Sequence, residues 1–333
     1  MSPFDSAPKD GPLTDRHGRV KRKLRVSLTD RCNFRCRYCM PEQPRWMPKR
    51  ELLTRDELAQ LAALFVESGI EAIRVTGGEP LLRADAVDCV AALNALRAHG
   101  LKRLSLTTNA SRLAPLLPAL RAAGLDDLNI SLDALDPARF RALRRAELAP
   151  VLEGIEAAHA LRVPYKLNTV LIRGENDADI VPLTEWAMER GAELRFIEYM
   201  PLDAPGSWSR DAVVGEDEVL AVLRRRFRVE RLPRGTDPAT EFLLDGRYRL
   251  GLITTVSKPF CGSCDRLRLT ARGELYPCLF STQGPQLGTA LRGGASRDEL
   301  LRTIRDGVWN KGAGYVALGG PVERPILMHA LGG

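Results

Sequence analysis

The 333-residue sequence lacks any apolar run close to the roughly 20 residues that a membrane-spanning helix needs. Its first 18 residues are polar and contain several acids, which fits neither a secretory leader nor a transit peptide. Aromatic residues make up only 6%, and no basic tract interleaved with aromatics marks a nucleic-acid groove. We therefore expect a cytoplasmic protein that binds neither membranes nor nucleic acids.

Histidine is also scarce, with four residues, whereas cysteine occurs seven times. Six of the cysteines form two groups, and Cys89 stands alone in an apolar helical pattern, where we expect a small core residue. In a reducing compartment, grouped cysteines indicate metal or cluster ligands rather than disulfides. The net charge of +7 suggests an anionic partner, although solvated arginines explain most of this excess. A nucleoside triphosphate would need only a few well-placed arginines.

Short apolar stretches alternate with helical patterns between residues 24 and 226. Six strands are expected, at Leu24–Leu28, Glu71–Thr76, Arg103–Thr107, Asp127–Leu132, Val163–Leu171 and Glu193–Glu198. The helices are expected after a capping box at Thr54 and Glu57, and at Asp85–Ala98, Ser111–Ala123, Glu147–Leu161 and Asp177–Arg190. Repeated βα units predict an α/β fold with a parallel sheet, here a partial (β/α)6 TIM-type barrel. An open doubly wound sheet is the alternative.

The character of the chain changes after residue 203, with a helix expected around Glu216–Phe227 and short strands near Glu241–Asp245 and Tyr248–Ile253. We predict three parts: a flexible N-terminal segment (residues 1–20), the partial barrel (21–228) and a small C-terminal cap (229–333). The cap contains the second cysteine group and ends in Gly332-Gly333.

The first cysteine group, Cys32, Cys36 and Cys39, directly follows the first expected strand. A [4Fe–4S] cluster normally takes four thiolates, so three would leave one iron open for chemistry. A zinc knuckle and buried structural cysteines are the alternatives, but zinc loops usually pair C-x2-C with a distant second pair. The spacing, with Tyr38 before the last cysteine, favours a cluster.

The second cysteine group is Cys261, Cys264 and Cys278, again three thiols. No histidine lies beside it in the sequence, so a second open [4Fe–4S] cluster fits better than a structural zinc. Arg266 and Arg268 follow at a spacing that points both side chains the same way on a strand. They could grip phosphate oxygens, or they could be two surface arginines.

Other distinctive residues also follow the expected strands. Gly77-Gly78-Glu79-Pro80 follows the second strand, where glycines let the backbone approach a ligand closely. Because parallel strands end at one face of a barrel, we expect these loops and the cysteines to share a cavity.

These motifs together resemble the radical S-adenosylmethionine (SAM) enzymes, and within them the GTP 3′,8-cyclase family of molybdenum cofactor biosynthesis. The resemblance runs from about residue 12 to residue 333 and rests on residues 24–41, 73–80, 106–109, 129–133, 166–170, 194–201, 260–268 and 278–280 and on the terminal glycine pair.

The resemblance implies a site residue by residue. The SAM cluster would be held by Cys32, Cys36 and Cys39, and the substrate cluster by Cys261, Cys264 and Cys278. SAM would be contacted by Tyr38, Gly78, Ser131 and Met200. GTP would be contacted by Arg25, Arg74, Thr107, Lys166, Arg266, Leu267 and Arg268. The terminal glycines would form a tail that enters the active site, and no catalytic residue is implied beyond the clusters.

The implied activity is that of a lyase. A 5′-deoxyadenosyl radical from SAM would abstract the C3′ hydrogen of GTP, and the C3′ radical would attack guanine C8. One electron and one proton would then complete (8S)-3′,8-cyclo-7,8-dihydroguanosine 5′-triphosphate. Implied partners are a low-potential electron donor, such as flavodoxin or ferredoxin, and a downstream cyclic pyranopterin monophosphate synthase. The protein would be a monomer or homodimer. Rival interpretations are a radical SAM modifier of peptides or RNA, and an electron carrier or zinc scaffold without turnover.

Overall fold

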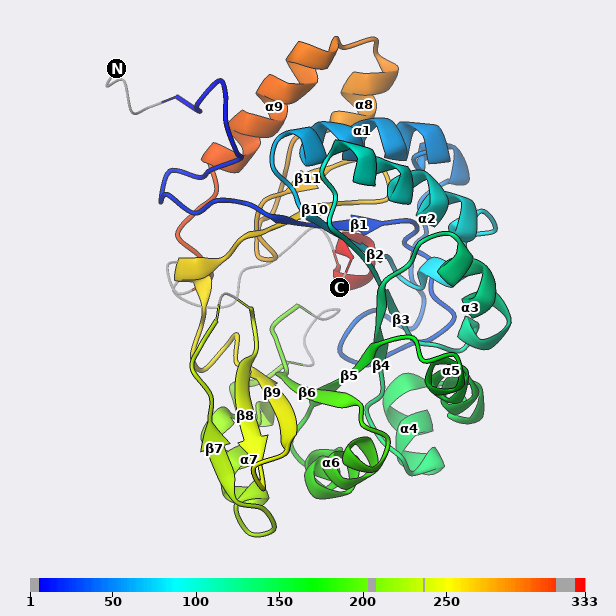
Figure 1. Cartoon of the computed structure of the whole chain (residues 1–333), viewed down its shortest axis with the longest axis vertical. Coiled ribbons are helices and arrows are strands. Elements are labelled where there is room, and N and C mark those ends of the chain that lie inside the picture. Colours follow the sequence, from blue (N-terminus) through cyan, green and yellow to red (C-terminus); the bar gives the residue numbers. More distant parts are fainter. Residues whose placement is uncertain (1–5, 203–207, 236, 316–326, 333) are drawn as a thin grey trace.

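The computed structural model describes residues 6–202, 208–235, 237–315 and 327–332. Its centre is one 11-stranded sheet with the strand order β11-β10-β1-β2-β3-β4-β5-β6-β9-β8-β7. The strands are β1 (Lys23–Ser27), β2 (Ala72–Thr76), β3 (Arg103–Thr108), β4 (Asp127–Ser131), β5 (Tyr165–Leu171), β6 (Glu193–Glu198), β7 (Val229–Arg231), β8 (Thr240–Leu244), β9 (Tyr248–Ile253), β10 (Arg266–Leu269) and β11 (Leu275–Tyr276). Figure 1 shows this sheet curving around the C-terminal end of the chain.

The six predicted strands are confirmed as neighbouring parallel strands β1 to β6, with bounds within two residues of those expected. The structure adds two parallel strands from the C-terminal region. β10 pairs with β1 at one side, and β9 pairs with β6 at the other. Antiparallel β11 and the β8–β7 pair complete the edges. The predicted α/β partial barrel is confirmed, and residues assigned to the cap extend its sheet.

The helices α1 to α9 lie on the outside of the curved sheet, whereas the short C-terminal helix α10 lies on its concave side (Figure 1). Their bounds are α1 (Arg55–Glu67), α2 (Ala86–Asn94), α3 (Leu113–Ala122), α4 (Pro137–Arg144), α5 (Ala149–Ala160), α6 (Ile180–Glu189), α7 (Glu216–Leu223), α8 (Leu287–Arg292), α9 (Arg297–Trp309) and α10 (Met328–Leu331). The Thr54–Glu57 capping box is confirmed: each side chain bonds the other residue's backbone N–H. Cys89 is fully buried in α2, as predicted. Helices α4, α8, α9 and α10 have no counterpart among the helices expected from the sequence.

Alternation along the strands separates the core from the cavity side. On β1, Leu24 and Val26 are buried in the hydrophobic core, whereas Arg25 lines a cavity. The same alternation on β10 buries Leu267 in the core and turns Arg266 and Arg268 to the cavity. The fold therefore gathers polar side chains from several strands on the concave side of the sheet.

Part of the N-terminal segment that the sequence predicts to be flexible packs against the body of the protein. Leu13, Asp15 and Arg19 are buried, and Thr14 pairs with Val20 in an isolated β-bridge. This small loop reaches the second cysteine group, as described below. None of the helices that the structure describes is long and apolar enough to span a membrane.

Candidate active site

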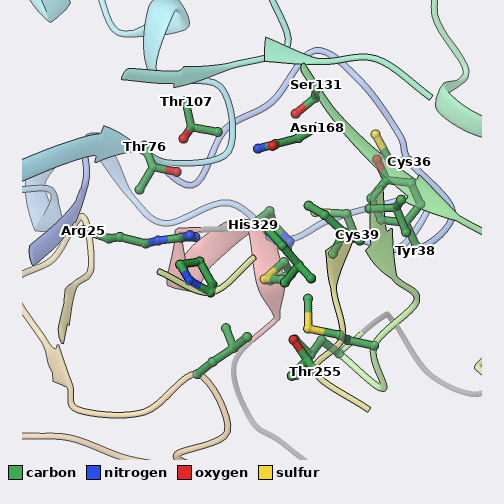
Figure 2. Close-up of a pocket in the computed structure, with 18 of the residues that line it drawn as sticks. Arg25, Cys36, Tyr38, Cys39, Thr76, Thr107, Ser131, Asn168, Thr255 and His329 are labelled. Atoms are coloured by element: carbon green, nitrogen blue, oxygen red, sulfur yellow. The ribbon is translucent and has the colours of Figure 1, made fainter. Parts of the chain in front are cut away.

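One cavity on the concave side of the sheet contains all six grouped cysteines among its lining residues. The two groups are brought together because β10, which follows Cys264, pairs directly with β1, which precedes Cys32. Figure 2 shows Cys36, Tyr38 and Cys39 on one side of this cavity, with Arg25, Thr107 and Ser131 around it. The two cysteine groups therefore face one shared space, the first from the loop after β1, as predicted, and the second from segments that flank β10 and β11.

The first cysteine group lies on the loop after β1, where Cys39 donates a backbone hydrogen bond to the carbonyl of Cys36. Burial, followed by the neighbouring cysteine Cys36, raises the pKa of the Cys32 thiol to about 12. Burial likewise raises the pKa values of Cys36 and Cys39. Protons are therefore held tightly on this group unless a bound metal displaces them, since a coordinating thiol is deprotonated.

A buried ion pair supports this loop from the end of α4. Arg144 pairs with Asp133, and its guanidinium also donates to the sulfur of Cys36 at 3.4 Å. The hydroxyl of Tyr38 donates to Asp133 at 2.7 Å, and Arg144 lies over the Tyr38 ring. Asp133 thus neutralises the cation that contacts the first cysteine group and fixes the aromatic ring predicted to contact SAM.

The Gly77–Pro80 turn packs directly against the same cysteine loop. A Cβ on Gly78 would lie 2.4 Å from the carbonyl oxygen of Arg31, so only glycine fits there. Glu79 is buried and accepts hydrogen bonds from the hydroxyl of Thr108 and the backbone N–H of Asn109. Burial outweighs these bonds and raises the pKa of Glu79 to about 7.

The second cysteine group begins with the short helical turn Cys261–Ser263 and ends at Cys278, beyond β11. Burial alone would raise the pKa of the Cys264 thiol, but the cations Arg266 and Lys311 lower it to about 6. The two cysteine groups therefore differ electrostatically, because the second has a thiol that ionises readily.

Arginines are numerous in the cavity that the two cysteine groups share. The cavity-lining set comprises Arg25, Arg74, Arg144, Arg195, Arg266 and Arg268. Burial, and then the nearby cations Arg268 and Arg74, hold the pKa of Arg25 well below its usual range. Burial also lowers the pKa of Arg74 to about 10. A polyanion entering the cavity would relieve this repulsion and accept charge-assisted hydrogen bonds.

Most of the residues predicted from the sequence line this cavity. They are the six cysteines, the SAM candidates Tyr38, Gly78, Ser131 and Met200, and the GTP candidates Arg25, Arg74, Thr107, Arg266 and Arg268. Lys166 and Leu267 are not in the lining of the cavity. Lys166 pairs with Glu193 at 2.6 Å, and the Leu267 side chain is buried in the core. Any contact of Leu267 with a substrate would have to come from its backbone.

The structure adds cavity or near-cavity residues that the sequence analysis missed. His329 lines the cavity beside the first cysteine group, and Lys311 contacts the second. Arg144 lies at the end of the unpredicted α4. No local pattern marks these residues, because each reaches the site only through tertiary folding. Gly333 and residues 203–207 lie outside the described residues, whereas Gly332 packs near Thr76 and Ser27.

The donor sets fit two iron–sulfur clusters. Each group offers three thiols to the cavity, and N–H donors lie within hydrogen-bonding range of sulfur in both. Among the described residues, no three His, Cys, Asp or Glu side chains are grouped to hold a single metal ion. A cubane cluster does not need such convergence, because each thiolate binds a different iron.

Comparisons with known proteins agree with this geometry. The Radical SAM superfamily model matches residues 26–187, and the Molybdenum Cofactor Synthesis C model matches residues 192–317. The GTP 3′,8-cyclase 2 of Mycobacterium tuberculosis is 47% identical over 339 residues, which cover 98% of this chain and 93% of the relative. The GTP 3′,8-cyclase of Streptomyces coelicolor is 46% identical over 342 residues, which cover 98% and 99%.

A solved structure shows a similar fold. Streptococcus suis SuiB bound to S-adenosylmethionine aligns with a TM-score of 0.56 at 13% identity, covering 87% of this chain and 69% of that one. At this identity the likeness supports the fold alone. The family is instead shown by the near-full-length matches to curated relatives. The chain therefore belongs to the GTP 3′,8-cyclase family of the radical SAM superfamily.

Proposed function

We propose that this chain uses SAM to cyclise GTP to (8S)-3′,8-cyclo-7,8-dihydroguanosine 5′-triphosphate, the first step of molybdenum cofactor biosynthesis. The observation that carries the proposal is one cavity lined by two cysteine triads with five arginines from β1, β2, β6 and β10. The family match agrees with it. When bound, the clusters supply the electron that cleaves SAM and an open iron for the guanine base.

The protein's own residues would hold SAM and GTP in fixed positions relative to each other. Gly78 lets its turn pack closely against the loop that leads into Cys32, so that its backbone can contact SAM there, and Tyr38 is held in place by its bond to Asp133. Ser131 and Met200 line the same cavity and are the further SAM contacts that the family resemblance implies. Rigid placement of this kind supplies orientation, which lowers the barrier between bound reactants.

The arginines would grip the triphosphate and so direct the ribose toward SAM. Arg25, Arg266 and Arg268 lie between the cysteine groups, and Arg74 and Thr107 lie on neighbouring strands. Each charge-assisted hydrogen bond contributes about 1.5–3 kcal/mol. Lys166, Leu267 and the Gly332-Gly333 tail stay in the proposal as contacts that the family resemblance implies.

The chemistry also calls for partners outside the chain. SAM cleavage needs a low-potential electron donor, for which flavodoxin or ferredoxin is suited. The cyclised product would pass to a cyclic pyranopterin monophosphate synthase. We place the enzyme in the cytoplasm, where grouped cysteines stay reduced and free to bind clusters.

The proposal is tested by anaerobic incubation of the reconstituted protein with SAM, dithionite and each nucleoside triphosphate in turn. We expect about eight irons per chain, and 5′-deoxyadenosine release that GTP stimulates and ATP does not. Cys36→Ser should abolish SAM cleavage, whereas Cys264→Ser should keep some cleavage and lose the cyclised product. One zinc and no iron, or equal stimulation by ATP and GTP, would reject the proposal.

A further inference from the structure

The side chain of Lys311 is buried directly against the second cysteine group. Lys311 is only 2% exposed, and its ammonium donates to the sulfur of Cys264 at 3.2 Å and to the carbonyl of Arg266 at 3.1 Å. A buried ammonium is costly unless an anion or strong acceptors surround it. A sulfur and a carbonyl are therefore unusual partners, unless the sulfur carries negative charge.

The neighbourhood of Lys311 contains further buried cations. Lys21 donates to the carbonyl of Cys264 at 2.8 Å, and Arg19 donates to the carbonyl of Cys261 at 2.8 Å. Both also pair with Asp15, whereas no ion pair joins Lys311 to a carboxylate among the described residues. This surplus of positive charge matches an anionic group held by Cys261, Cys264 and Cys278.

Backbone amides complete the surroundings of the second group. The N–H of Tyr315 points to the sulfur of Cys261 at 3.4 Å, and the N–H of Phe280 points to the sulfur of Cys278 at 3.5 Å. The Phe280 and Tyr315 rings also pack together, with centroids 4.5 Å apart. All three sulfurs thus receive an N–H donor. Two of the donors to Cys264 carry a full positive charge: the Lys311 ammonium at 3.2 Å and the Arg266 guanidinium at 3.7 Å. Lys311 is the nearer and more deeply buried of the two.

The first cysteine group is balanced differently. Its cationic donor, Arg144, contacts Cys36 but is paired with the buried carboxylate of Asp133. The carboxylate of Asp133 therefore largely cancels the positive charge near the first cysteine group. No carboxylate pairs in this way with Lys311 beside the second group among the described residues. Hydrogen bonds and charge near the sulfurs are known to set the reduction potential of iron–sulfur clusters.

We propose that Lys311, through its bond to Cys264, raises the reduction potential of the second cluster and makes that cluster easier to reduce than the first. Lys311 is a positioning residue, because it acts through Cys264 and not on the substrate. The inference rests on the proposed function, since it requires a cluster at the second cysteine group. Its sign follows from electrostatics, because reduction adds negative charge beside the ammonium.

The test is an EPR-monitored redox titration of each cluster alone in reconstituted full-length protein. The second cluster is observed in a Cys32/Cys36/Cys39→Ser background, and the first in a Cys261/Cys264/Cys278→Ser background. Lys311→Met should lower the reduction potential of the second cluster by about 59 mV. At a fixed applied potential, its ratio of reduced to oxidised cluster should then fall about tenfold. Lys311→Arg should keep most of the original reduction potential of the second cluster. The reduction potential of the first cluster should not change in either variant.

Lys102→Met is the matched control, because Lys102 is an exposed lysine paired with Glu71. An unchanged potential in Lys311→Met, or an equal shift of both clusters, would overturn the inference. If Lys311→Met and Lys311→Arg both lose the iron of the second cluster, Lys311 is structural only and the tuning role is likewise rejected. Absence of the second cluster from the Cys32/Cys36/Cys39→Ser protein with Lys311 intact would instead refute the proposed function.

Discussion

Arg25 on β1 and Arg268 on β10 occupy paired positions of adjacent parallel strands, so two guanidinium groups meet where the first and last parallel strands of the sheet join. Arg74 pairs with Arg25 from the other side, on β2. Burial and these cations lower the pKa of Arg25, which means that its charge is disfavoured in the protein without ligand. The cavity thus maintains a repulsive arrangement that an anion would stabilise.

The first prediction concerns Arg25→Met, which keeps the apolar stem and removes the charge. We expect GTP to bind about 10- to 100-fold more weakly, the loss of one charge-assisted hydrogen bond. Without GTP, relief of the repulsion should raise the free energy of unfolding by about 1 kcal/mol. Isothermal titration calorimetry and urea denaturation measure the two effects.

Arg22→Met is the control for this prediction, because Arg22 precedes β1, has a side chain 55% exposed and pairs with Glu71. It should leave GTP affinity unchanged. If Arg25→Met weakened binding and also destabilised the ligand-free protein, the repulsion inferred between the cavity arginines would be wrong.

The second prediction concerns Gly78→Ala. The added methyl group would collide with the backbone carbonyls of Asp30 and Arg31, which belong to the loop that leads into Cys32. A flexible side chain could rotate away from the new methyl group, but these carbonyls belong to the backbone. The loop that contains Cys32 would therefore have to shift. We expect a loss of stability of about 1–3 kcal/mol and incomplete loading of the first cluster, measured by thermal unfolding and iron content.

Gly235→Ala provides the comparison, because a Cβ at Gly235 would meet nothing within 4 Å. That variant should retain normal iron content and stability. Full iron content and normal stability in Gly78→Ala would show that the turn tolerates a side chain and that close packing is not its purpose.

Much of this site follows from local sequence, because strand alternation is a local property. Each of Arg25, Arg74 and Arg268 stands between apolar residues in its strand, so alternation alone predicts that they share the face opposite the core. The cysteine loop is predicted from the spacing of its cysteines. The extent of the parallel sheet could not be predicted from local sequence. β9 pairs with β6 and β10 pairs with β1, and both pairings join segments that are distant in the chain.

Contacts between distant residues explain what the sequence could not reveal. Arg144 reaches Cys36 across 108 positions, and Lys311 reaches Cys264 across 47. Neither residue belongs to a motif, and a basic residue near the end of a helix is usually solvated. Lys166 shows the same limit, because its ion pair with Glu193 on the adjacent strand also depends on pairing between distant segments.

The third prediction concerns Glu79 and pH. Its pKa is about 7 in the folded protein, compared with about 4.5 when exposed, because burial outweighs its hydrogen bonds. Between these values the folded protein keeps a proton that the unfolded chain has lost, so the free energy of unfolding falls as pH rises. The contribution of Glu79 is complete below about pH 4.5 and is lost by about pH 7, a change of about 3 kcal/mol.

Urea denaturation of the cluster-free protein at several pH values measures this dependence. Glu79→Gln, which cannot ionise, should flatten the slope between pH 4.5 and 7. Asp126→Asn is the comparison, because Asp126 is a partly exposed carboxylate that pairs with Arg97 elsewhere on the surface. An identical slope in Glu79→Gln and the unmodified chain would mean that Glu79 is ionised in the folded protein.

The fourth prediction concerns α10, whose residues Met328 and His329 line the cavity (Figure 2). Leu331 is 1% exposed and packs with Tyr276 and Ala330, and a Cβ on Gly332 would lie 2.9 Å from Thr76. Leu331→Asp would bury an unpaired carboxylate, which is unfavourable enough to release so short a helix. Hydrogen exchange at residues 328–332 should therefore become much faster, with little change in global stability.

Leu331→Met keeps an apolar side chain of similar volume and should retain slow exchange. Turnover measured on the same two variants decides what the docked helix does. If Leu331→Asp frees the tail and the rate of GTP cyclisation falls while Leu331→Met is unaffected, docking is part of the active state. If the tail is freed and turnover is unchanged, α10 only fills space in the cavity of the ligand-free protein, and substrate would displace it on binding.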